Sequence, residues 1–264
     1  MIEQRNPVSD LIADGAALDQ LVAGLSPEQW RIPTPAPDWS IAHQIAHLAA
    51  TFRLAGLAAS NPEGFAALGA RLSPDFNASV TAALNEYVGD PPEVLLDRWR
   101  AERAGAEKAL GALPPHQQVP WLVRPLPAGV LACAGMMETF AHGQDIADAL
   151  DVDRTHTDRI GQLVAFAVRT WDFGYQARKL PTPDVAFRFE ITAPSGAVWE
   201  FGPADSPERI SGPAVDFCLL VTRRRHPDDL AVRALGPLAT EWLGLAQAYR
   251  GPAGEGRRPG QFRP

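Results

Sequence analysis

Two histidines and one glutamate are the residues of this chain that best combine into a reactive site. Glu138 and His142 lie four positions apart in a long apolar segment, so on an α-helix their side chains share one face. His47 lies in a second apolar segment, where a buried histidine needs a hydrogen-bond partner or a metal ion. Two imidazoles and one carboxylate can hold a divalent transition metal and leave coordination positions open. We therefore predict a metal site formed by His47, Glu138 and His142.

Simpler explanations exist for each part of this set. Glu138, His142 and Asp145 fall within about 60° of helical arc, which is also typical of a helix with one side in water. A lone histidine in an apolar helix is often a core residue with a satisfied hydrogen bond. His43, one turn before His47, is a further possible ligand, but we expect it to face the substrate or to support the site. Asp145 could orient a ligand imidazole.

The first part of the chain has the periodicity of a helical bundle. The pattern predicts long helices over residues 9–24, 41–60, 90–110 and 130–150, with shorter helical segments between them. Ser26–Gln29 and Asp90–Glu93 each read as a capping box that opens a helix. Four long helices fit a four-helix bundle, in which metal sites form from side chains on facing helices.

The pattern changes after residue 153, where we expect a small α+β domain. It contains a helix over residues 158–179, an alternating strand over 185–192 with a hairpin partner over 197–201, a helix from Ser211 to 222, a short strand over 230–234 and a helix over 237–250. The fold class is therefore mostly α. The expected division is a bundle over 1–153, the α+β domain over 154–251, and a disordered tail over 252–264 that is rich in Gly, Pro and Arg.

Composition narrows the classes of partner. The net charge of −7 and the pI of about 5.4 argue against nucleic acid. The sequence contains no apolar run of the ~18 residues that a membrane span needs. Two cysteines in apolar segments favour a reducing, cytoplasmic location. We expect a small-molecule substrate, no nucleic acid or membrane partner, and a monomer or homodimer.

The segment around His47 resembles a known motif. Residues 37–48, PDWSIAHQIAHL, resemble the second helix of the DinB-like metal-binding four-helix bundles, and the nearest branch is the mycothiol-dependent maleylpyruvate isomerase type common in actinobacteria. In that family a His before Leu on the second helix and a Glu-x3-His on the fourth helix hold the metal. His47, Glu138 and His142 match those positions. The resemblance implies Zn²⁺, although Ni, Mn or Fe would also suit these ligands.

A second segment resembles the same branch. Residues 216–225, DFCLLVTRRR, resemble a stretch of its small second domain in which an arginine near a helix end reaches the active site. The family usually has Gly-Arg there. Here Arg223 takes the glycine position and Arg224 matches the arginine, so it is open which of Arg223, Arg224 and Arg225 faces the pocket. Arginines after a helix also offset its dipole, a contribution of about 0.3–1 kcal/mol.

The resemblance implies a metal-dependent enzyme that uses a low-molecular-weight thiol, such as mycothiol, as co-substrate. The expected reaction is a thiol-dependent transfer or isomerisation of a small electrophilic or carboxylate-bearing metabolite. Arg224 would bind the carboxylate through its planar guanidinium, and His43 is the second candidate catalytic residue. Two alternatives remain: a metal-dependent hydrolase or lyase of a biosynthetic pathway, and a non-catalytic protein that binds a metal and a small molecule.

Overall fold

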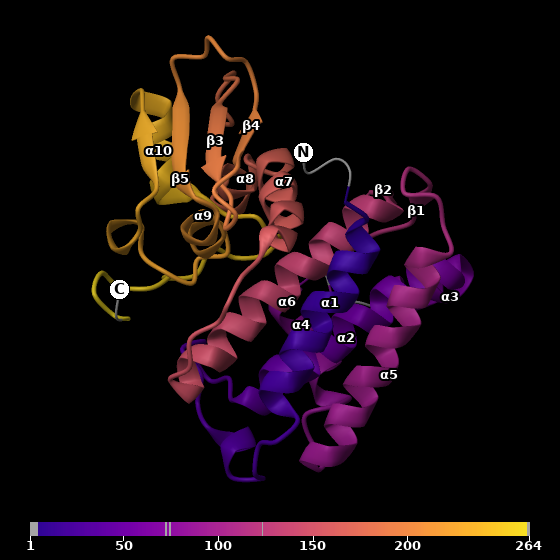
Figure 1. Ribbon diagram of the computed structural model, residues 1–264. Coiled ribbons are helices and arrows are strands. Elements are labelled where there is room, and N and C mark those ends of the chain that lie inside the picture. Colours follow the sequence, from indigo (N-terminus) through magenta and orange to yellow (C-terminus); the bar gives the residue numbers. More distant parts are fainter. Residues whose placement is uncertain (1–4, 72, 74, 123, 263–264) are drawn as a thin grey trace. The chain divides into compact units, whose positions relative to one another are not determined.

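The computed structural model describes residues 5–71, 73, 75–122 and 124–262. Contacts along the chain divide these residues into two compact units, which are residues 6–154 and residues 155–262 together with Arg5. Figure 1 labels most of the helices and strands of each unit. None of the described helices combines the length and the apolarity that a membrane span requires.

The first unit, called the bundle below, is almost entirely helical. Its four long helices are α1, α2, α5 and α6 (Figure 1). The elements are α1 Pro7–Val22, η2 Gln29–Arg31, α2 Ile41–Ser60, α3 Pro62–Gly69, α4 Phe76–Asn85, α5 Pro92–Gly111, β1 Gln118–Val119, β2 Leu126–Pro127 and α6 Ala128–Leu150. The long helices expected from the periodicity are confirmed, and α2 has the expected bounds. β1 and β2 form a two-residue antiparallel pair inside the proline-rich loop.

Small residues let α2 pack closely on its neighbours. α2 lies along α5 and also contacts α6, while α1 lies along α6. Ile41, Ile45 and Leu48 of α2 have no exposed surface, and each such side chain stabilises the fold by roughly 1.5–3 kcal/mol. A Cβ added at Gly56 would lie 3.4 Å from the backbone of Ala106 on α5. This close packing holds α2, which carries His47, against the rest of the bundle.

One of the two expected capping boxes is present. The backbone N–H of Ser26 donates to Oε1 of Gln29 over 2.8 Å, and the N–H of Gln29 reaches Oγ of Ser26 at 3.4 Å. The prediction of a capping box at Asp90–Glu93 is wrong, because α5 begins after Pro91 without a side-chain cap. The carboxylate of Asp90 instead accepts a hydrogen bond from Arg98 at 2.6 Å. The carboxylate that was expected to cap α5 therefore forms a salt bridge with Arg98 of the same helix.

The second unit is built on a four-stranded mixed sheet. Its elements are η3 Asp158–Ile160, α7 Gly161–Arg169, α8 Phe173–Ala177, β3 Arg188–Thr192, β4 Val198–Phe201, β5 Arg209–Pro213, α9 Ala214–Val221, η4 Pro227–Asp229, β6 Arg233–Leu235 and α10 Pro237–Leu245. The strand order is β4-β3-β5-β6, with β3 and β5 parallel and the other pairs antiparallel. The expected hairpin is therefore confirmed as β3 and β4.

Aromatic rings fill the core of the second unit. Phe189 of β3 lies 5.6 Å from the ring centroid of Trp242 on α10 and 5.9 Å from that of Phe217 on α9. Phe187 joins this cluster at 6.1 Å from Phe189. The period-two alternation over residues 185–191 thus directs one face of β3 into the core, as expected for a half-buried strand. The core fixes α9, which leads into the arginines considered below.

The bounds expected for two helices of the second unit differ from those in the structure, although the helix expected from Ser211 to 222 is present as α9 Ala214–Val221. The helix expected over 158–179 is divided into η3, α7 and α8, with a break at Thr170, whose hydroxyl donates to the carbonyl of Phe166. After the break, Gly174 approaches the carbonyl of Leu245 so closely that a Cβ there would lie 2.0 Å from it. Ser211-Gly212-Pro213, expected to open a helix, instead completes β5, and Gly212 takes φ 151° opposite Val232.

The described part of the C-terminal segment makes contacts with the second unit, and the disordered tail expected from its composition stays a prediction. The backbone N–H of Gly260 donates to the carboxylate of Asp229 over 2.8 Å. The guanidinium of Arg225 lies 4.0 Å from the ring centroid of Phe262. These polar and cation–π contacts replace the apolar burial that the segment lacks.

Candidate metal centre

The bundle brings together the three residues that the sequence singled out as metal ligands. α2 supplies His47, and α6 supplies Glu138 and His142 one turn apart. Oε2 of Glu138 lies 3.4 Å from Nε2 of His47 and 3.2 Å from Nε2 of His142. One potential ligand atom from each residue lies within 4.8 Å of the other two. The side chains therefore converge on one small volume.

This group of side chains is partly open to solvent. The side chains of His47 and Glu138 are 20% and 23% exposed, and that of His142 is 11% exposed. The helix that carries His47 is otherwise largely buried, since Gln44, Ile45 and Leu48 have no exposed surface. The three side chains are therefore partly accessible, while the apolar residues of α2 beside them are buried.

The electrostatics of the group favour a charged carboxylate. Burial raises the pKa of Glu138, but hydrogen bonds and positive charge from His142 and His47 outweigh that effect and hold this pKa well below its usual range. Glu138 is therefore ionised at neutral pH. An anionic oxygen between two imidazole nitrogens is a strong attractor for a cation.

Trp39 forms an aromatic wall beside both histidines. Its ring centroid lies 5.3 Å from that of His47 and 5.8 Å from that of His142, with which it stacks at an interplanar angle of 21°. The two imidazole rings are themselves 4.4 Å apart. The loop before α2 holds Trp39 here, because an isolated β-bridge joins Pro33 to Ser40. The wall restricts the ring orientations that the histidines can adopt.

His43 has a local role at the start of α2. Its Nδ1 lies 2.8 Å from Oγ of Ser40 and accepts the backbone N–H of Ser40 at 3.3 Å. Burial lowers the pKa of His43, which favours the neutral ring. With Nδ1 as an acceptor, the proton of the neutral ring resides on Nε2. Asp145, further along α6, has no exposed surface.

Gln44 contacts the candidate centre, although the sequence did not identify it as functional. Its Oε1 lies 2.5 Å from Nδ1 of His142, on the side of the ring opposite the triad nitrogen. Thr51 lies on the other side of the centre, with its Oγ1 3.5 Å from Nε2 of His47. The available signal was an amide side chain in the buried face of an otherwise apolar helix, three residues before His47.

In the second unit, the arginine turn, Thr222–Arg225, follows α9. The backbone N–H of Arg223 donates to the carbonyl of Leu220 and that of Arg224 to Leu219, both over 2.9 Å. This pattern is a Schellman motif, which requires a left-handed residue, and Arg223 accordingly has φ 59°. Glycine is the usual residue at such a position, so the geometry explains why Gly-Arg suits this turn.

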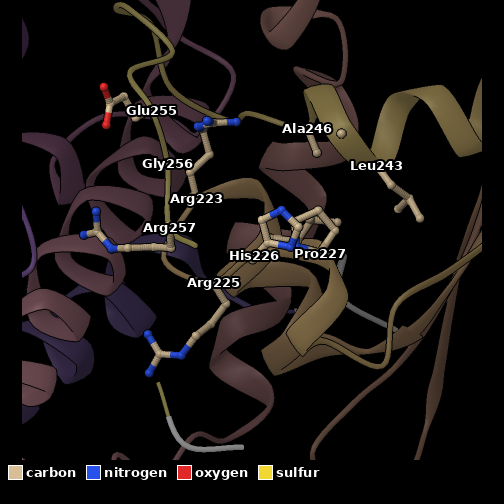
Figure 2. Close-up of a pocket in the computed structure, with 11 residues that line it drawn as sticks. Arg223, Arg225, His226, Pro227, Leu243, Ala246, Glu255, Gly256 and Arg257 are labelled. Atoms are coloured by element: carbon tan, nitrogen blue, oxygen red, sulfur yellow. The ribbon is translucent and has the colours of Figure 1, made fainter. Parts of the chain in front are cut away.

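The arginines of the turn differ in their surroundings. Nη1 of Arg224 donates to the carbonyl of Thr222 over 2.7 Å, which directs its guanidinium back to the helix end. A pocket of about 170 Å³ within the second unit is lined by Arg223 and Arg225 (Figure 2). Figure 2 also shows the guanidinium of Arg257 extending, like that of Arg225, to the side away from Leu243. Arg224 is not among the described residues that line this pocket.

Comparison with solved structures relates the fold to one enzyme. The crystal structure of the mycothiol-dependent maleylpyruvate isomerase matches with a TM-score of 0.52 and 14% identity, covering 83% of this chain and 88% of that one. A mutant of that isomerase matches with a TM-score of 0.55 and 13% identity, covering 89% and 92%. At this level of identity the likeness concerns the fold, which is a DinB-like bundle followed by a region containing a sheet.

Comparison with sequences identifies the family. Two uncharacterized proteins from two strains of Mycobacterium tuberculosis are each 42% identical over 250 residues, covering 95% of this chain and 97% of theirs. Residues 183–235 match the family model described as wyosine base formation. Residues 12–147, just over half of the chain, match the model described as the mycothiol maleylpyruvate isomerase N-terminal domain. The resemblance seen in the sequence is thereby confirmed, and the chain belongs to the mycothiol maleylpyruvate isomerase N-terminal domain family.

Proposed function

We propose that this protein is a metal-dependent enzyme that uses a thiol of the mycothiol type to isomerise, or transfer a group to, a small electrophilic metabolite. The observation that carries the proposal is the convergence of His47, Glu138 and His142 within 4.8 Å, in a chain of this family. In the proposed division of labour, the bundle over residues 1–153 binds the metal and the domain over 154–251 supplies Arg224.

The donor set fits a small divalent cation. Two ligand atoms that each lie about 2.0–2.1 Å from a tetrahedral ion are separated by roughly 3.3 Å. The Glu138–His47 and Glu138–His142 separations of 3.4 and 3.2 Å agree with that spacing. Three protein ligands with one side open are typical of catalytic rather than structural zinc sites. We propose Zn²⁺, with Ni, Mn or Fe as the alternatives that the same donors accept.

The residues around the centre have separable roles in this proposal. When bound, the metal lowers the pKa of a coordinated thiol and so supplies a thiolate nucleophile at neutral pH. Glu138 holds negative charge toward the ion and is therefore not available as a general base. Trp39 stacks on the ring of His142 and lies tilted beside that of His47, so it shields part of both imidazoles.

Two further residues are proposed to act on the substrate. Arg224 binds a substrate carboxylate through the two parallel N–H groups of its guanidinium, a geometry that lysine lacks. His43, whose Nδ1 accepts from Ser40, offers its Nε2–H as a hydrogen-bond donor. The Arg224 assignment follows the resemblance of residues 216–225 to the family pattern, and the His43 assignment follows from a triad that is already complete with His47, Glu138 and His142.

The test measures metal binding and thiol binding separately. Purified protein is dialysed against Zn²⁺ and analysed for metal content, and mycothiol binding is then titrated calorimetrically with and without the metal. We expect one Zn²⁺ per chain and thiol binding that depends on it. His47→Ala should lower Zn²⁺ affinity more than ~100-fold, beyond the usual effect of losing a residue behind a ligand. His116→Ala, a change at an exposed histidine of the bundle, is the matched control.

Other outcomes would redirect the proposal. Zn²⁺ binding without any affinity for mycothiol would favour a metal-dependent hydrolase or lyase, or a protein that binds without catalysis. Equal Zn²⁺ affinity in wild type and His47→Ala, with an unchanged melting temperature in chelator, would reject the metal centre itself.

A further inference from the structure

We propose that Gln44 and Thr34 are positioning residues that fix the tautomer of His142 and so present its Nε2 to the metal. The inference rests on the proposed metal centre, and it concerns residues that touch neither metal nor substrate. Hydrogen bonds link the carbonyl of Trp39 through Thr34 and Gln44 to His142. Because the carbonyl can only accept, it determines which group donates in each of the other bonds.

The chain begins at the carbonyl oxygen of Trp39. Oγ1 of Thr34 lies 2.7 Å from this oxygen, and the backbone N–H of Thr34 donates to the same oxygen over 2.7 Å. A carbonyl has no proton to give, so the hydroxyl of Thr34 must be the donor. The single hydroxyl proton of Thr34 is thereby committed to Trp39.

The next link orients the amide of Gln44. Nε2 of Gln44 lies 2.8 Å from Oγ1 of Thr34, which can only accept because its proton is already used. The nitrogen of the amide therefore faces Thr34, and the oxygen faces His142. This assignment does not depend on telling the oxygen from the nitrogen directly, because the surrounding bonds permit only one of the two orientations.

The last link determines the proton on His142. Oε1 of Gln44, an acceptor, lies 2.5 Å from Nδ1 of His142, so Nδ1 carries a proton. Metal binding requires the ring to give up the proton that Nε2 shares with Glu138, and because Nδ1 keeps its own proton, Nε2 is the nitrogen that offers a lone pair. Nε2 is the atom that lies 3.2 Å from the carboxylate of Glu138 and belongs to the triad. The relay thus selects the nitrogen that can bind a cation.

The local fold makes this relay rigid. Gln44 has no exposed surface, so water does not compete for its amide. The backbone N–H of Ile41 donates to the carbonyl of Ile32 over 3.1 Å and, with the Pro33–Ser40 bridge, closes the loop that carries Thr34 and Trp39. Trp39 also stacks on the face of the His142 ring. The same loop therefore orients the imidazole of His142 in two ways, through Thr34 and Gln44 at Nδ1 and through Trp39 on the face of the ring.

The first test removes the acceptor. Gln44→Met keeps the length of the side chain but leaves Nδ1 of His142 without its partner. We expect Zn²⁺ affinity, measured by competition with a chromophoric chelator, to fall about 10–100-fold, the range seen when a residue behind a metal ligand is lost. In metal-free protein, at a pH where the ring is neutral, ¹H–¹⁵N spectra should report Nδ1–H in wild type and a mixture of tautomers in the variant.

A matched series tests the outer link and guards against misfolding. Thr34→Val removes the hydroxyl and should weaken Zn²⁺ binding in the same direction as Gln44→Met, whereas Thr34→Ser should restore wild-type affinity. Thr139→Val deletes a hydroxyl of the bundle that bonds only within α6, to the carbonyl of Gly135 at 2.9 Å, and should bind Zn²⁺ like wild type. If Gln44→Met does not fold, the two Thr34 variants decide the question.

The outcomes separate this inference from the metal centre on which it rests. Unchanged Zn²⁺ affinity in His47→Ala would reject the centre, while the tautomer spectra of metal-free protein would still test the relay. Loss of binding in His47→Ala, combined with wild-type affinity and wild-type spectra in Gln44→Met and Thr34→Val, would overturn the relay alone.

Discussion

The metal centre and the arginine turn are polar clusters of opposite construction. In the centre, the regular helices α2 and α6 bring a carboxylate between two imidazoles, so unlike charges stabilise one another. In the turn, Arg223–Arg225 are consecutive like charges at the point where the backbone leaves α9, and carbonyl oxygens accept side-chain hydrogen bonds from Arg224 and Arg225. The first arrangement suits a cation and the second an anion. In the proposed function, this difference predicts that loss of metal binding and loss of substrate binding can be separated by mutation.

Arg224→Ala should show the largest difference between the two clusters, because it should impair turnover without changing metal content. Loss of a charged hydrogen-bonding pair costs about 1.5–3 kcal/mol, so kcat/KM of the proposed thiol-dependent reaction should fall roughly 10–150-fold. Metal content should stay at the wild-type level, since the centre lies in the bundle. A loss of activity in Arg223→Ala or Arg225→Ala, with Arg224→Ala active, would move the carboxylate-binding role to the neighbouring arginine.

The charge of the centre predicts a distinct response to acid. Because the pKa of Glu138 in the folded protein is below its unfolded value of about 4.3, its contribution to stability is present above that pH and is lost as the pH falls toward the folded pKa. Each unit of depression corresponds to about 1.4 kcal/mol. In chelator, the melting temperature of wild type should therefore fall more steeply below pH 4.3 than that of Glu138→Gln. Parallel curves would contradict this.

The smallest expected effect concerns the backbone of the arginine turn. Arg223→Gly and Arg223→Ala both remove the guanidinium, but only alanine keeps the steric cost of the left-handed conformation. The glycine variant should therefore be more stable than the alanine variant by about 1 kcal/mol in urea unfolding. Equal stabilities would mean that the turn relaxes out of the Schellman geometry when the side chain is removed.

The parts of the centre that depend on helical spacing could be predicted from the sequence. The i, i+4 spacing of Glu138 and His142 fixes their shared face, and the burial pattern of residues 41–60 places His47 on an inward helix. The relay through Gln44 could not be predicted, because its partner His142 is distant in sequence and is brought near only by helix packing. Hydrogen bonds of this kind leave no periodic signal.

The second unit was harder to predict for a related reason. Tertiary contacts override local preference there, as where Gly212-Pro213 extends β5 and delays the start of α9 to Ala214, and where the helix expected over 158–179 breaks at Thr170. The strand expected from the alternation of residues 185–191 was predicted correctly, because side chains that point to opposite faces of a strand leave a period-two pattern in the sequence itself. Arg223 was aligned with a glycine of the family pattern, and its left-handed backbone follows from hydrogen bonds at the end of α9.

The position of Trp39 has a practical consequence. Because its indole stacks on His142 and lies 5.3 Å from His47, its excited state is within quenching range of any paramagnetic ion held by those rings. The chain thus contains an intrinsic fluorescent reporter of occupancy at the centre. The emission difference between wild type and Trp39→Phe would isolate this signal from the other six tryptophans and would follow loading with Ni²⁺ or Co²⁺ in real time without an added dye.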